Sequence, residues 1–411
     1  MFIICQIGAR EHYAIARALD ASGMLAGLLT DFWVPPGSGF SHLPGASRLR
    51  DRFHPDLADA KVMAPNVRFL AFELKQRIAK RHGWPVNIAR NRLFQRQAIA
   101  KISKAPGTNH KEQSTRNKEP TTLFSYSYAA RDLFRFAKSR GWITVLGQID
   151  PGPEEERIVA AEHQRYPALA SRWQPAPASY WDAWREELDL ADRIIVNSDW
   201  SRRCLLKEGV SADKLEIVPL VYGTDGRHGQ EEESQQTQRT NNKAQKFKVL
   251  FLGQIILRKG IGRLLDAMRL LNDEPVELIL AGPSEIEADA WADLPNVHWP
   301  GPVPRSEVGR IYQDAGCFIL PTLSDGYALT QLEALSHGLP VIASRHCGDA
   351  VTHGHNGWIL DDLEPETIAT AIRIAMQERP HAIRTPGFTL DDLATALIGK
   401  DARRPANHPG Q

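Results

Sequence analysis

The 411-residue chain lacks the features of several common protein classes. No run approaches the roughly 18 consecutive apolar residues of a membrane-spanning helix. The net charge is only +1, so overall charge favours neither nucleic acid nor acidic partners. Neither half has Gly-x-Gly-x-x-Gly after a predicted strand, which disfavours a dinucleotide-dependent dehydrogenase.

Cysteine is also scarce. The chain has four cysteines, which share no metal-ligand spacing: Cys5, Cys204, Cys317 and Cys347. We expect buried thiols in a reducing compartment, and no metal site. The first eight residues have no basic leader and no small-residue cleavage site, so they predict a strand rather than a secretion signal. The sequence therefore predicts a cytoplasmic protein whose membrane contact, if any, is peripheral.

Strand and helix patterns alternate along both halves of the chain. Strands separated by helices of about ten to fifteen residues predict parallel pairing. The expected fold class is α/β, with two Rossmann-like, doubly wound parallel-sheet domains facing a central cleft. The predicted divisions are an N-terminal domain at 1–225 with a solvated insertion at 104–120, a polar linker at 226–246, a C-terminal domain at 247–380, and a helix with a disordered tail at 381–411. One expected helix of the C-terminal domain lies near Ser284–Trp291.

A basic loop follows the first predicted strand of the C-terminal domain. That strand ends at Gly253, and Arg258 and Lys259 precede Gly260 at the start of a predicted helix. The free amides and macrodipole of a helix start attract anions, and two positive side chains beside them suit a diphosphate. The spacing excludes a Walker-type phosphate loop. The alternative is a solvated basic turn capped by glycine.

A second polar loop carries two carboxylates eight positions apart. Asp325 follows a predicted strand, and Glu333 lies one turn into the next predicted helix. Open parallel sheets bind ligands at the carboxyl ends of their strands, so we expect both carboxylates in the crevice. Gly326 permits close approach of the backbone to a ligand. The amides expected to point at a phosphate belong to Ala328, Leu329 and Thr330. The alternative is an aspartate at the start of a helix and a surface glutamate.

From Val249 to about Met376 the chain resembles the C-terminal domain of retaining GT-B glycosyltransferases, particularly glycosyltransferase family four (group 1). The matching motifs, in order, are Leu280-Ala281-Gly282, Asp325-Gly326-Tyr327-Ala328-Leu329, Glu333-Ala334, Gly338-Leu339-Pro340-Val341-Ile342 and His355-Asn356-Gly357-Trp358. Two positions depart from the family. Asp325 stands where relatives have glutamate, and Gln254 stands where many carry a phosphate-binding arginine.

The resemblance implies a hexosyltransferase-like enzyme that uses a nucleotide-diphosphate sugar and retains the anomeric configuration. The implied catalytic residues are Lys259 and Arg258, which would neutralise the leaving diphosphate, and Asp325, which would contact the transferred sugar. Glu333 would bind the ribose. The implied donor-binding residues are Gly253, Gly326, Tyr327, Ala328, Leu329, Thr330 and Glu333. No cofactor and no metal is expected, because basic side chains and a helix dipole can replace a cation. The acceptor would be a glycan or a lipid-linked sugar, in polysaccharide or glycoconjugate biosynthesis.

The first half resembles the family more loosely. Gly8, Arg10 and His12 follow the first predicted strand, where the family has an acceptor-side loop. Asp150 ends a later strand at the edge of the cleft, near a position where many relatives have histidine. The alternative for Arg10 and His12 is an Arg–Glu pair and a half-exposed histidine at a helix start.

The segment 74–104 is rich in lysine and arginine, has no acidic residue after Leu74, and interleaves these charges with apolar residues. Such a segment predicts peripheral contact with an anionic membrane, which would place the protein at the inner face. A solvated helix is the alternative. Nucleic acid is not an expected partner, since no recognisable binding module accompanies the charge. Two rival functions stay open: a GT-B sugar-nucleotide epimerase or phosphorylase, and a non-catalytic nucleotide-binding Rossmann protein.

Overall fold

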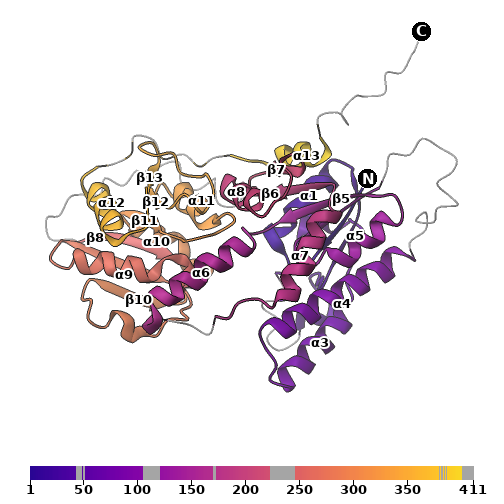
Figure 1. The fold of residues 1–411 in the computed structure, drawn as a ribbon, viewed down its shortest axis with the longest axis horizontal. Helices are drawn as coiled ribbons and strands as arrows, with labels where there is room; N and C mark the ends of the chain where they lie inside the picture. Colours follow the sequence, from indigo (N-terminus) through magenta and orange to yellow (C-terminus); the bar gives the residue numbers. More distant parts are fainter. Residues whose placement is uncertain are drawn as a thin grey trace, which may run out of the picture.

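The structure is a computed structural model that describes residues 1–42, 49, 51–104, 121–169, 173–222, 246–378, 380, 383, 385 and 387–399. Residues 105–120 of the predicted insertion, nearly all of the predicted linker, and the predicted tail from 400 onward lie outside this part. The described chain forms two parallel sheets, each packed with helices, at opposite ends of an elongated molecule (Figure 1). The predicted fold class is therefore confirmed.

The first sheet has the strand order β3-β2-β1-β4-β5-β6-β7, and every pair is parallel. Its strands are β1 (Phe2–Gln6), β2 (Leu25–Thr30), β3 (Val62–Met63), β4 (Thr122–Tyr126), β5 (Ile143–Gln148), β6 (Arg193–Val196) and β7 (Leu215–Ile217). The helices of this part of the chain are α1 (Ala14–Ala21), α3 (Asn66–Ile78), α4 (Trp84–Ile102), α5 (Arg131–Lys138), α6 (Pro153–Arg165), α7 (Ala178–Leu190) and α8 (Asp199–Lys207).

The second sheet repeats the same winding, with the order β10-β9-β8-β11-β12-β13. Its strands are β8 (Phe247–Leu252), β9 (Val276–Ala281), β10 (Val297–Gly301), β11 (Cys317–Leu320), β12 (Val341–Ala343) and β13 (Gly357–Ile359). The helices are α9 (Ile261–Leu270), α10 (Val308–Asp314), α11 (Leu329–Ser336), α12 (Pro365–Gln377) and α13 (Leu390–Ile398). The strand order changes direction between β1 and β4 in the first sheet and between β8 and β11 in the second. Doubly wound sheets bind their ligands at these reversal points.

The central strands are apolar because helices cover both of their faces. All four residues of β11 are buried, which is the pattern of a strand inside a parallel sheet. The four cysteines are buried and unpaired, as the sequence predicted. Among the described residues, none of the helices has the length and apolar content needed to cross a membrane.

Two helices leave the domain that their sequence position predicts. α6 follows β5 of the first sheet, yet it lies beside α9, where Arg263 binds the buried Glu162 at 2.9 Å (Figure 1). α13 follows the second sheet but packs against α1 through its buried residues Leu393, Ala394 and Leu397. A capping box between Thr389 and Asp392 fixes the start of α13. The chain therefore crosses between the two halves more than once.

The prediction of a helix near Ser284–Trp291 is wrong. Ser284 bends the chain instead, because its hydroxyl donates to the Ile286 carbonyl and accepts from the Ile286 amide. Only a short 3-10 turn forms, at Ala288–Trp291. Local side-chain bonds of this kind compete with helix formation, and periodicity does not reveal them.

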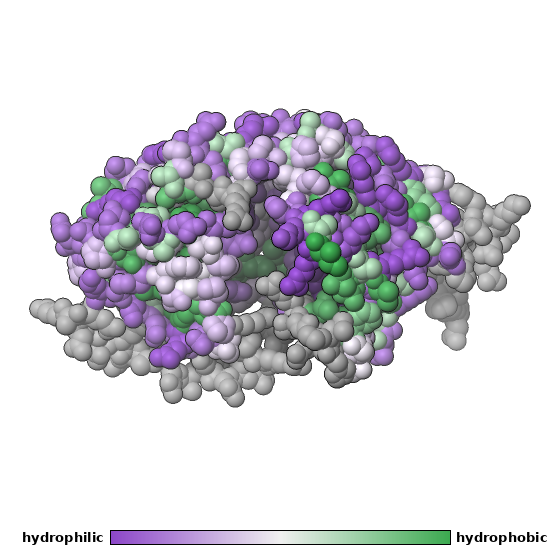
Figure 2. All heavy atoms as spheres, turned by 90° about the horizontal axis from the view of Figure 1, so that it is seen from below, coloured by the Kyte–Doolittle hydropathy of each residue, from purple (hydrophilic) through white to green (hydrophobic). Residues whose placement is uncertain are grey.

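Viewed from below, the molecule is hollowed between its two halves (Figure 2). The loops at the carboxyl ends of β1, β4, β8 and β11 all belong to the reversal points of the two sheets. The fold thus positions the candidate site in this cleft.

Candidate active site

The basic loop is held against the end of β11 by a glycine. Arg258 and Lys259 belong to a 3-10 turn, Leu257–Lys259, that ends at Gly260 with φ +75°. A Cβ at Gly260 would lie 2.0 Å from the carbonyl oxygen of Pro321, so no other residue fits without a shift of backbone. This close approach brings the basic pair beside the loop that carries Asp325.

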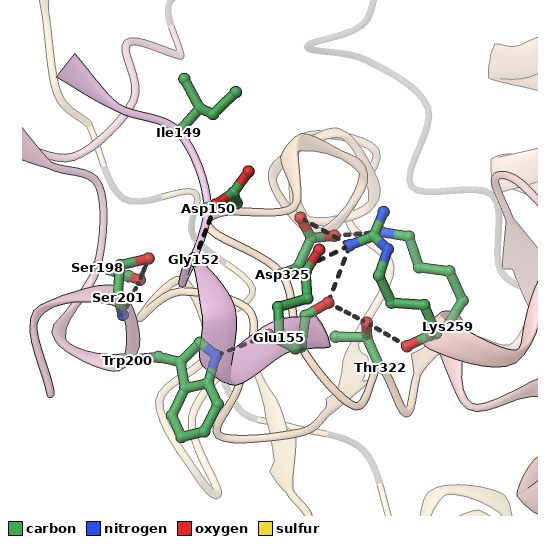
Figure 3. Close-up of polar contacts among 12 residues, drawn as sticks. Ile149, Asp150, Gly152, Glu155, Ser198, Trp200, Ser201, Lys259, Thr322 and Asp325 are labelled. Atoms are coloured by element: carbon green, nitrogen blue, oxygen red, sulfur yellow. Dashed lines mark hydrogen bonds and ion pairs between the residues drawn. The ribbon is translucent and has the colours of Figure 1, made fainter. Parts of the chain in front are cut away.

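Asp325 lies between the two cations. Its carboxylate accepts a hydrogen bond from Lys259 Nζ, and its Oδ1 lies 3.6 Å from Arg258 Nη1 (Figure 3). Arg258 Nη1 also donates to the Ser324 carbonyl at 2.9 Å. Burial alone would raise the pKa of Asp325, but Lys259 and Arg258 outweigh burial and hold this pKa below its usual value. The Asp325 carboxylate is therefore charged at neutral pH.

A second carboxylate reaches this cluster from α6. Glu155 Oε2 lies 3.7 Å from Arg258 Nη1, is buried, and has no hydrogen-bond partner in the described chain. Burial raises the pKa of Glu155 to about 8, although the charge of Arg258 opposes the rise. The sequence analysis missed this residue. The only signal is the run Glu154–Glu156 after Gly-Pro, which does not show which of the three glutamates faces inward.

Asp150 lies in the loop between β5 and α6. Its Oδ1 accepts hydrogen bonds from the Tyr128 hydroxyl, from the Gly152 amide at 2.9 Å and from Gln148 Nε2 at 3.2 Å. Burial raises the pKa of Asp150, against the opposing effect of the Tyr128 and Gly152 donors and of the charges on Arg258 and Arg10. The predicted cleft residues Asp150 and Arg258 are thus close enough to interact electrostatically.

The two halves touch directly beside this cluster. A Cβ at Gly326 would lie 2.2 Å from the Ile149 carbonyl oxygen of the other half, so the predicted close approach here is to protein backbone. Asn197 Nδ2 donates to the same carbonyl at 3.3 Å. Trp200 Nε1 donates to Ser324 Oγ at 3.2 Å (Figure 3), and the Trp200 ring stacks on His346 at 4.0 Å. The cleft is closed on this side.

The amides expected to meet a phosphate are not all free. The Ala328 amide donates to the Cys347 carbonyl at 3.0 Å, so in this conformation it is already bonded. Leu329 and Thr330 form the first turn of α11, where helical amides have no partner within the helix. The Tyr327 ring lies against Gly348, where a Cβ would come within 2.5 Å of it. Gly253 follows β8, and its amide donates to the Ala281 carbonyl.

Glu333 faces different neighbours from Asp325. It lies on α11, and its Oε2 accepts a hydrogen bond from the Tyr312 hydroxyl at 3.1 Å. The Tyr312 ring stacks on His337, which keeps that hydroxyl in place. No contact joins Glu333 to Asp325 among the described residues, so the structure does not bring the two predicted carboxylates together.

The predicted acceptor-side loop is strained. Glu11, His12 and Tyr13 have φ of 51°, 48° and 61°, a run of left-handed residues that costs roughly 1–2 kcal/mol each. Gly8 has φ +82° and donates its amide to Asp31 Oδ1 at 2.8 Å. The loop exposes His12, while the Arg10 guanidinium lies over the Tyr126 ring. Strain of this kind persists only where the surrounding structure enforces it.

No group of three or more His, Cys, Asp or Glu side chains in the described part of the chain has an arrangement that could hold a metal ion. The three carboxylates of the cleft, Asp150, Glu155 and Asp325, surround Arg258 instead. The arrangement can attract an anion at Arg258 and Lys259 and can offer oxygen acceptors to hydroxyl groups around it.

Residues 246–378 match the family model described as "Glycosyl transferases group 1". The chain is 30% identical over 243 residues to a D-inositol 3-phosphate glycosyltransferase of Corynebacterium urealyticum, which covers 51% of this chain and 56% of the relative. It is 25% identical over 189 residues to the amylovoran biosynthesis glycosyltransferase AmsK of Erwinia amylovora, covering 42% and 44%. The chain thus matches about half the length of these curated relatives.

Solved structures resemble the whole chain. Anabaena Alr3699/HepE in complex with UDP superposes with a TM-score of 0.56 at 14% identity, covering 97% of this chain and 94% of that one. The lipopolysaccharide-biosynthesis glycosyltransferase WaaG gives 0.56 at 17% identity, covering 96% and 94%. These likenesses establish the fold, which is GT-B, as the sequence predicted.

Proposed function

We propose that the chain is a retaining glycosyltransferase that moves a sugar from a nucleotide diphosphate to a glycan or lipid-linked acceptor. The observation that carries the proposal is the group of Arg258, Lys259 and Asp325 at the reversal point of a group 1 domain, facing Asp150 and Glu155 across the cleft. One relative is named for amylovoran biosynthesis, another is named an O-antigen chain mannosyltransferase, and one structural neighbour was solved in complex with UDP-glucose.

The donor diphosphate would bind at Arg258 and Lys259, near the first turn of α11. Negative charge grows on the diphosphate as the sugar leaves, and fixed cations in a water-poor cleft stabilise that charge. Asp325 would exchange part of its contact with Lys259 for a hydroxyl of the transferred sugar. We propose that these side chains supply the positive charge without a metal ion, so EDTA should leave the transfer rate unchanged.

Retention requires the acceptor to attack from the face that the diphosphate leaves. Asp150 and the loop at Gly8, Arg10 and His12 would position the acceptor hydroxyl there. Glu333 would bind the ribose, with Tyr312 orienting its carboxylate. Contact between the two halves would keep water from the donor.

The acceptor side would dock on the inner face of an anionic membrane. α3 exposes Val67, Leu74 and Ile78. These residues share one face of the helix because they are spaced seven and then four residues apart. Exposed Arg68, Lys75 and Arg77 flank this apolar face. Figure 2 shows apolar atoms bordered by hydrophilic ones on the underside of this half. The arrangement suits insertion between anionic headgroups.

The function can be tested with UDP-, GDP- and ADP-sugars. The full chain is first screened for ligand-induced rises in melting temperature, and nucleotide release is then followed with glycan acceptors present. Lys259→Ala should weaken binding of the accepted nucleotide at least tenfold, which is about 1.4 kcal/mol. Lys248→Ala, a lysine of the same domain on β8, serves as the control.

Three outcomes would separate the rival functions. An isomerised nucleotide sugar without added acceptor would indicate an epimerase, and binding without turnover would indicate a non-catalytic nucleotide-binding protein. A product with inverted anomeric configuration, read by NMR, would contradict retention. Unchanged affinity in Lys259→Ala would contradict the donor site itself.

A further inference from the structure

The two carboxylate oxygens of Asp150 have different surroundings. Oδ1 accepts three hydrogen bonds, from the Tyr128 hydroxyl, from the Gly152 amide at 2.9 Å and from Gln148 Nε2 at 3.2 Å. Oδ2 accepts no hydrogen bond from the residues that the structure describes, and the residue is only partly buried. In Figure 3 the second oxygen points away from the Gly152 amide. Because an ionised carboxylate only accepts hydrogen bonds, Oδ2 is an open acceptor for a hydroxyl group.

A buried tryptophan fixes the orientation of Gln148. Trp184 Nε1 donates to Gln148 Oε1 at 3.0 Å, and an indole can only donate, so the amide oxygen lies on that side and Nε2 faces Asp150. Gln148 Nε2 donates to the Asp150 carbonyl at 2.9 Å as well as to Oδ1. Both Trp184 and Gln148 are buried. Gln148 therefore holds the backbone and the side chain of Asp150 together.

Tyr128 is held at its backbone and at its ring. Its φ of +74° is unfavourable for a tyrosine. The amide donates to the buried Glu187 at 2.6 Å, and the carbonyl accepts from Asn91 Nδ2 at 2.9 Å. The ring stacks on Tyr180 at 4.9 Å with an interplanar angle of 18°. A strained residue persists only where its surroundings enforce it, and here these contacts direct the hydroxyl at Asp150.

The backbone beside Asp150 is fixed against the other half of the molecule. The Ile149 carbonyl accepts a hydrogen bond from Asn197 Nδ2 at 3.3 Å. The same carbonyl lies against Gly326, where a Cβ would come within 2.2 Å of its oxygen. Gly326 directly follows Asp325, so these contacts set the position of the Asp150 carboxylate relative to the donor-side loop.

We propose that Tyr128 is a positioning residue for sugar transfer: its hydroxyl holds Oδ1 of Asp150, so that Oδ2 accepts a hydrogen bond from the attacking hydroxyl of the acceptor. This inference rests on the glycosyltransferase function proposed for the cleft. Tyr128 acts through Asp150 and does not itself touch the substrate. A hydroxyl that is held in line for attack reaches the reacting carbon without a search over orientations, which is the gain that positioning gives.

The Tyr128 hydroxyl also favours the ionised form of Asp150. Burial raises the pKa of Asp150, and the hydrogen bond from Tyr128 is the largest opposing effect. The other charged or titratable groups of the described chain that interact with Asp150 are Arg258, Arg10, Glu155 and Tyr180. None of them is replaced when the Tyr128 hydroxyl is removed, so a further rise in the pKa of Asp150 reports the loss of that one donor.

The test is Tyr128→Phe, which removes the hydroxyl and keeps the ring that stacks on Tyr180. Nucleotide release from UDP-glucose, GDP-mannose and ADP-glucose is measured with octyl glycosides of glucose, galactose and mannose as acceptors, and the sugar nucleotide with the fastest release is used over about pH 5–9. We expect kcat to fall about tenfold while the donor KM changes less than about twofold, because the lost contact acts on the acceptor in the transition state. The acid limb of the kcat profile should move to higher pH, because Asp150 loses a donor that lowers its pKa.

Tyr180→Phe is the matched control. It removes the hydroxyl of the neighbouring ring, which makes no hydrogen bond in the described part of the chain, and it should leave kcat and the pH profile unchanged. A second comparison uses Asp150→Ala, which has no carboxylate to position. Adding Tyr128→Phe to Asp150→Ala should lower kcat no further, since the two residues act as a unit.

The positioning role is overturned by an unshifted acid limb in Tyr128→Phe, by an equal loss in Tyr180→Phe, or by a further loss of kcat in the Asp150→Ala background. A lower melting temperature with an unshifted pH profile would mean that the hydroxyl only stabilises the fold. No nucleotide release from any of the three sugar nucleotides by the unmodified chain would contradict the proposed function. Release that Tyr128→Phe leaves unchanged would contradict only the role of Tyr128.

Discussion

At the residue scale, the cleft is defined by charges that compensate one another. Lys259 and Asp325 form a close pair, and Arg258 is shared between Asp325 at 3.6 Å and Glu155 at 3.7 Å. A donor diphosphate must compete with these carboxylates for the two cations. Because Glu155 is neutral below its raised pKa, Arg258 keeps more of its charge for the donor at neutral pH than at alkaline pH.

The first prediction concerns pH. Glu155 has a pKa of about 8, so it is protonated below this value and becomes negative above it. The new charge beside Arg258 opposes an anion, and nucleotide-diphosphate affinity should therefore fall as pH rises from 7 to 9. Glu155→Gln should remove this fall, as measured by calorimetric titration across the pH range.

Glu154→Gln provides the control for this prediction. Glu154 precedes Glu155 on α6 but binds Lys207 at 2.6 Å, away from the cleft cations. Its replacement should leave the pH dependence unchanged. An equal alkaline loss of affinity in Glu155→Gln would show that another group, such as Asp150, is responsible.

A second prediction concerns the contact between Gly326 and Ile149. Gly326→Ala would place a methyl group 2.2 Å from the Ile149 carbonyl oxygen, so the two halves must move apart. Overpacking of this kind costs about 1–3 kcal/mol, and transfer activity should fall with it. Gly309→Ala is the control, because its nearest neighbour is a His337 side-chain atom at 3.5 Å. The melting temperature and the transfer rate of both variants are measured. Equal losses in Gly326→Ala and Gly309→Ala would contradict a specific contact between Gly326 and Ile149.

At the scale of elements, α6 is a helix that was not predicted from the sequence. Its residues lie between two strands of the first sheet, so the sequence alone assigns it to the N-terminal half. In the structure Tyr166 donates to Asp266, and Arg263 binds Glu162 across the same helix pair. The Glu162 side chain is only 2% exposed, and burying a carboxylate so deeply is costly unless a cation such as Arg263 pairs with it. α6 thereby holds Glu155 in the cleft.

The third prediction tests this helix. Arg263→Ala leaves the buried Glu162 without its partner, and the free energy of unfolding should fall by roughly 3–5 kcal/mol. Arg269→Ala, on the same helix α9, removes an exposed pair with Asp266 and should cost at most about 1 kcal/mol. Urea unfolding measures both. Equal losses would mean that α6 is not held by this ion pair.

Strand and helix positions were otherwise predictable where local signals agree. The sequence predicts a strand at Val341–Ala343 from the apolar run after Gly338-Leu339-Pro340, and a helix at Pro365–Gln377 from the helix start at Pro365. The structure confirms both, as β12 and α12. The prediction of a helix near Ser284–Trp291 was wrong because local signals compete there: the Ser284 hydroxyl bonds to the Ile286 backbone in place of helical hydrogen bonds. In the site, Arg258, Lys259 and Asp325 were predicted from motifs, whereas Glu155 and Tyr128 were not.

At the scale of the whole molecule, the fourth prediction concerns membrane docking. Replacing Val67, Leu74 and Ile78 with serine should abolish flotation of the protein with anionic vesicles at low salt. Each basic residue near the surface adds about 1 kcal/mol, so high salt should also release the unmodified chain. Leu270→Ser, which changes a 48% exposed leucine of α9, is the control and should float normally. Flotation that is insensitive to salt and to the triple change would contradict docking through α3.

The sequence by itself determined the alternation of strands and helices, the two doubly wound sheets and the loop positions of Lys259 and Asp325. Those features follow from local periodicity, glycine and chain order, and a parallel sheet brings the carboxyl ends of its strands to one edge. Only the tertiary structure decided that α6 crosses to the other half, that Glu155 joins the cations, and that the Tyr128 hydroxyl donates to Asp150. These contacts join residues far apart in the chain, and they depend on burial and on close backbone approach, which no local pattern encodes.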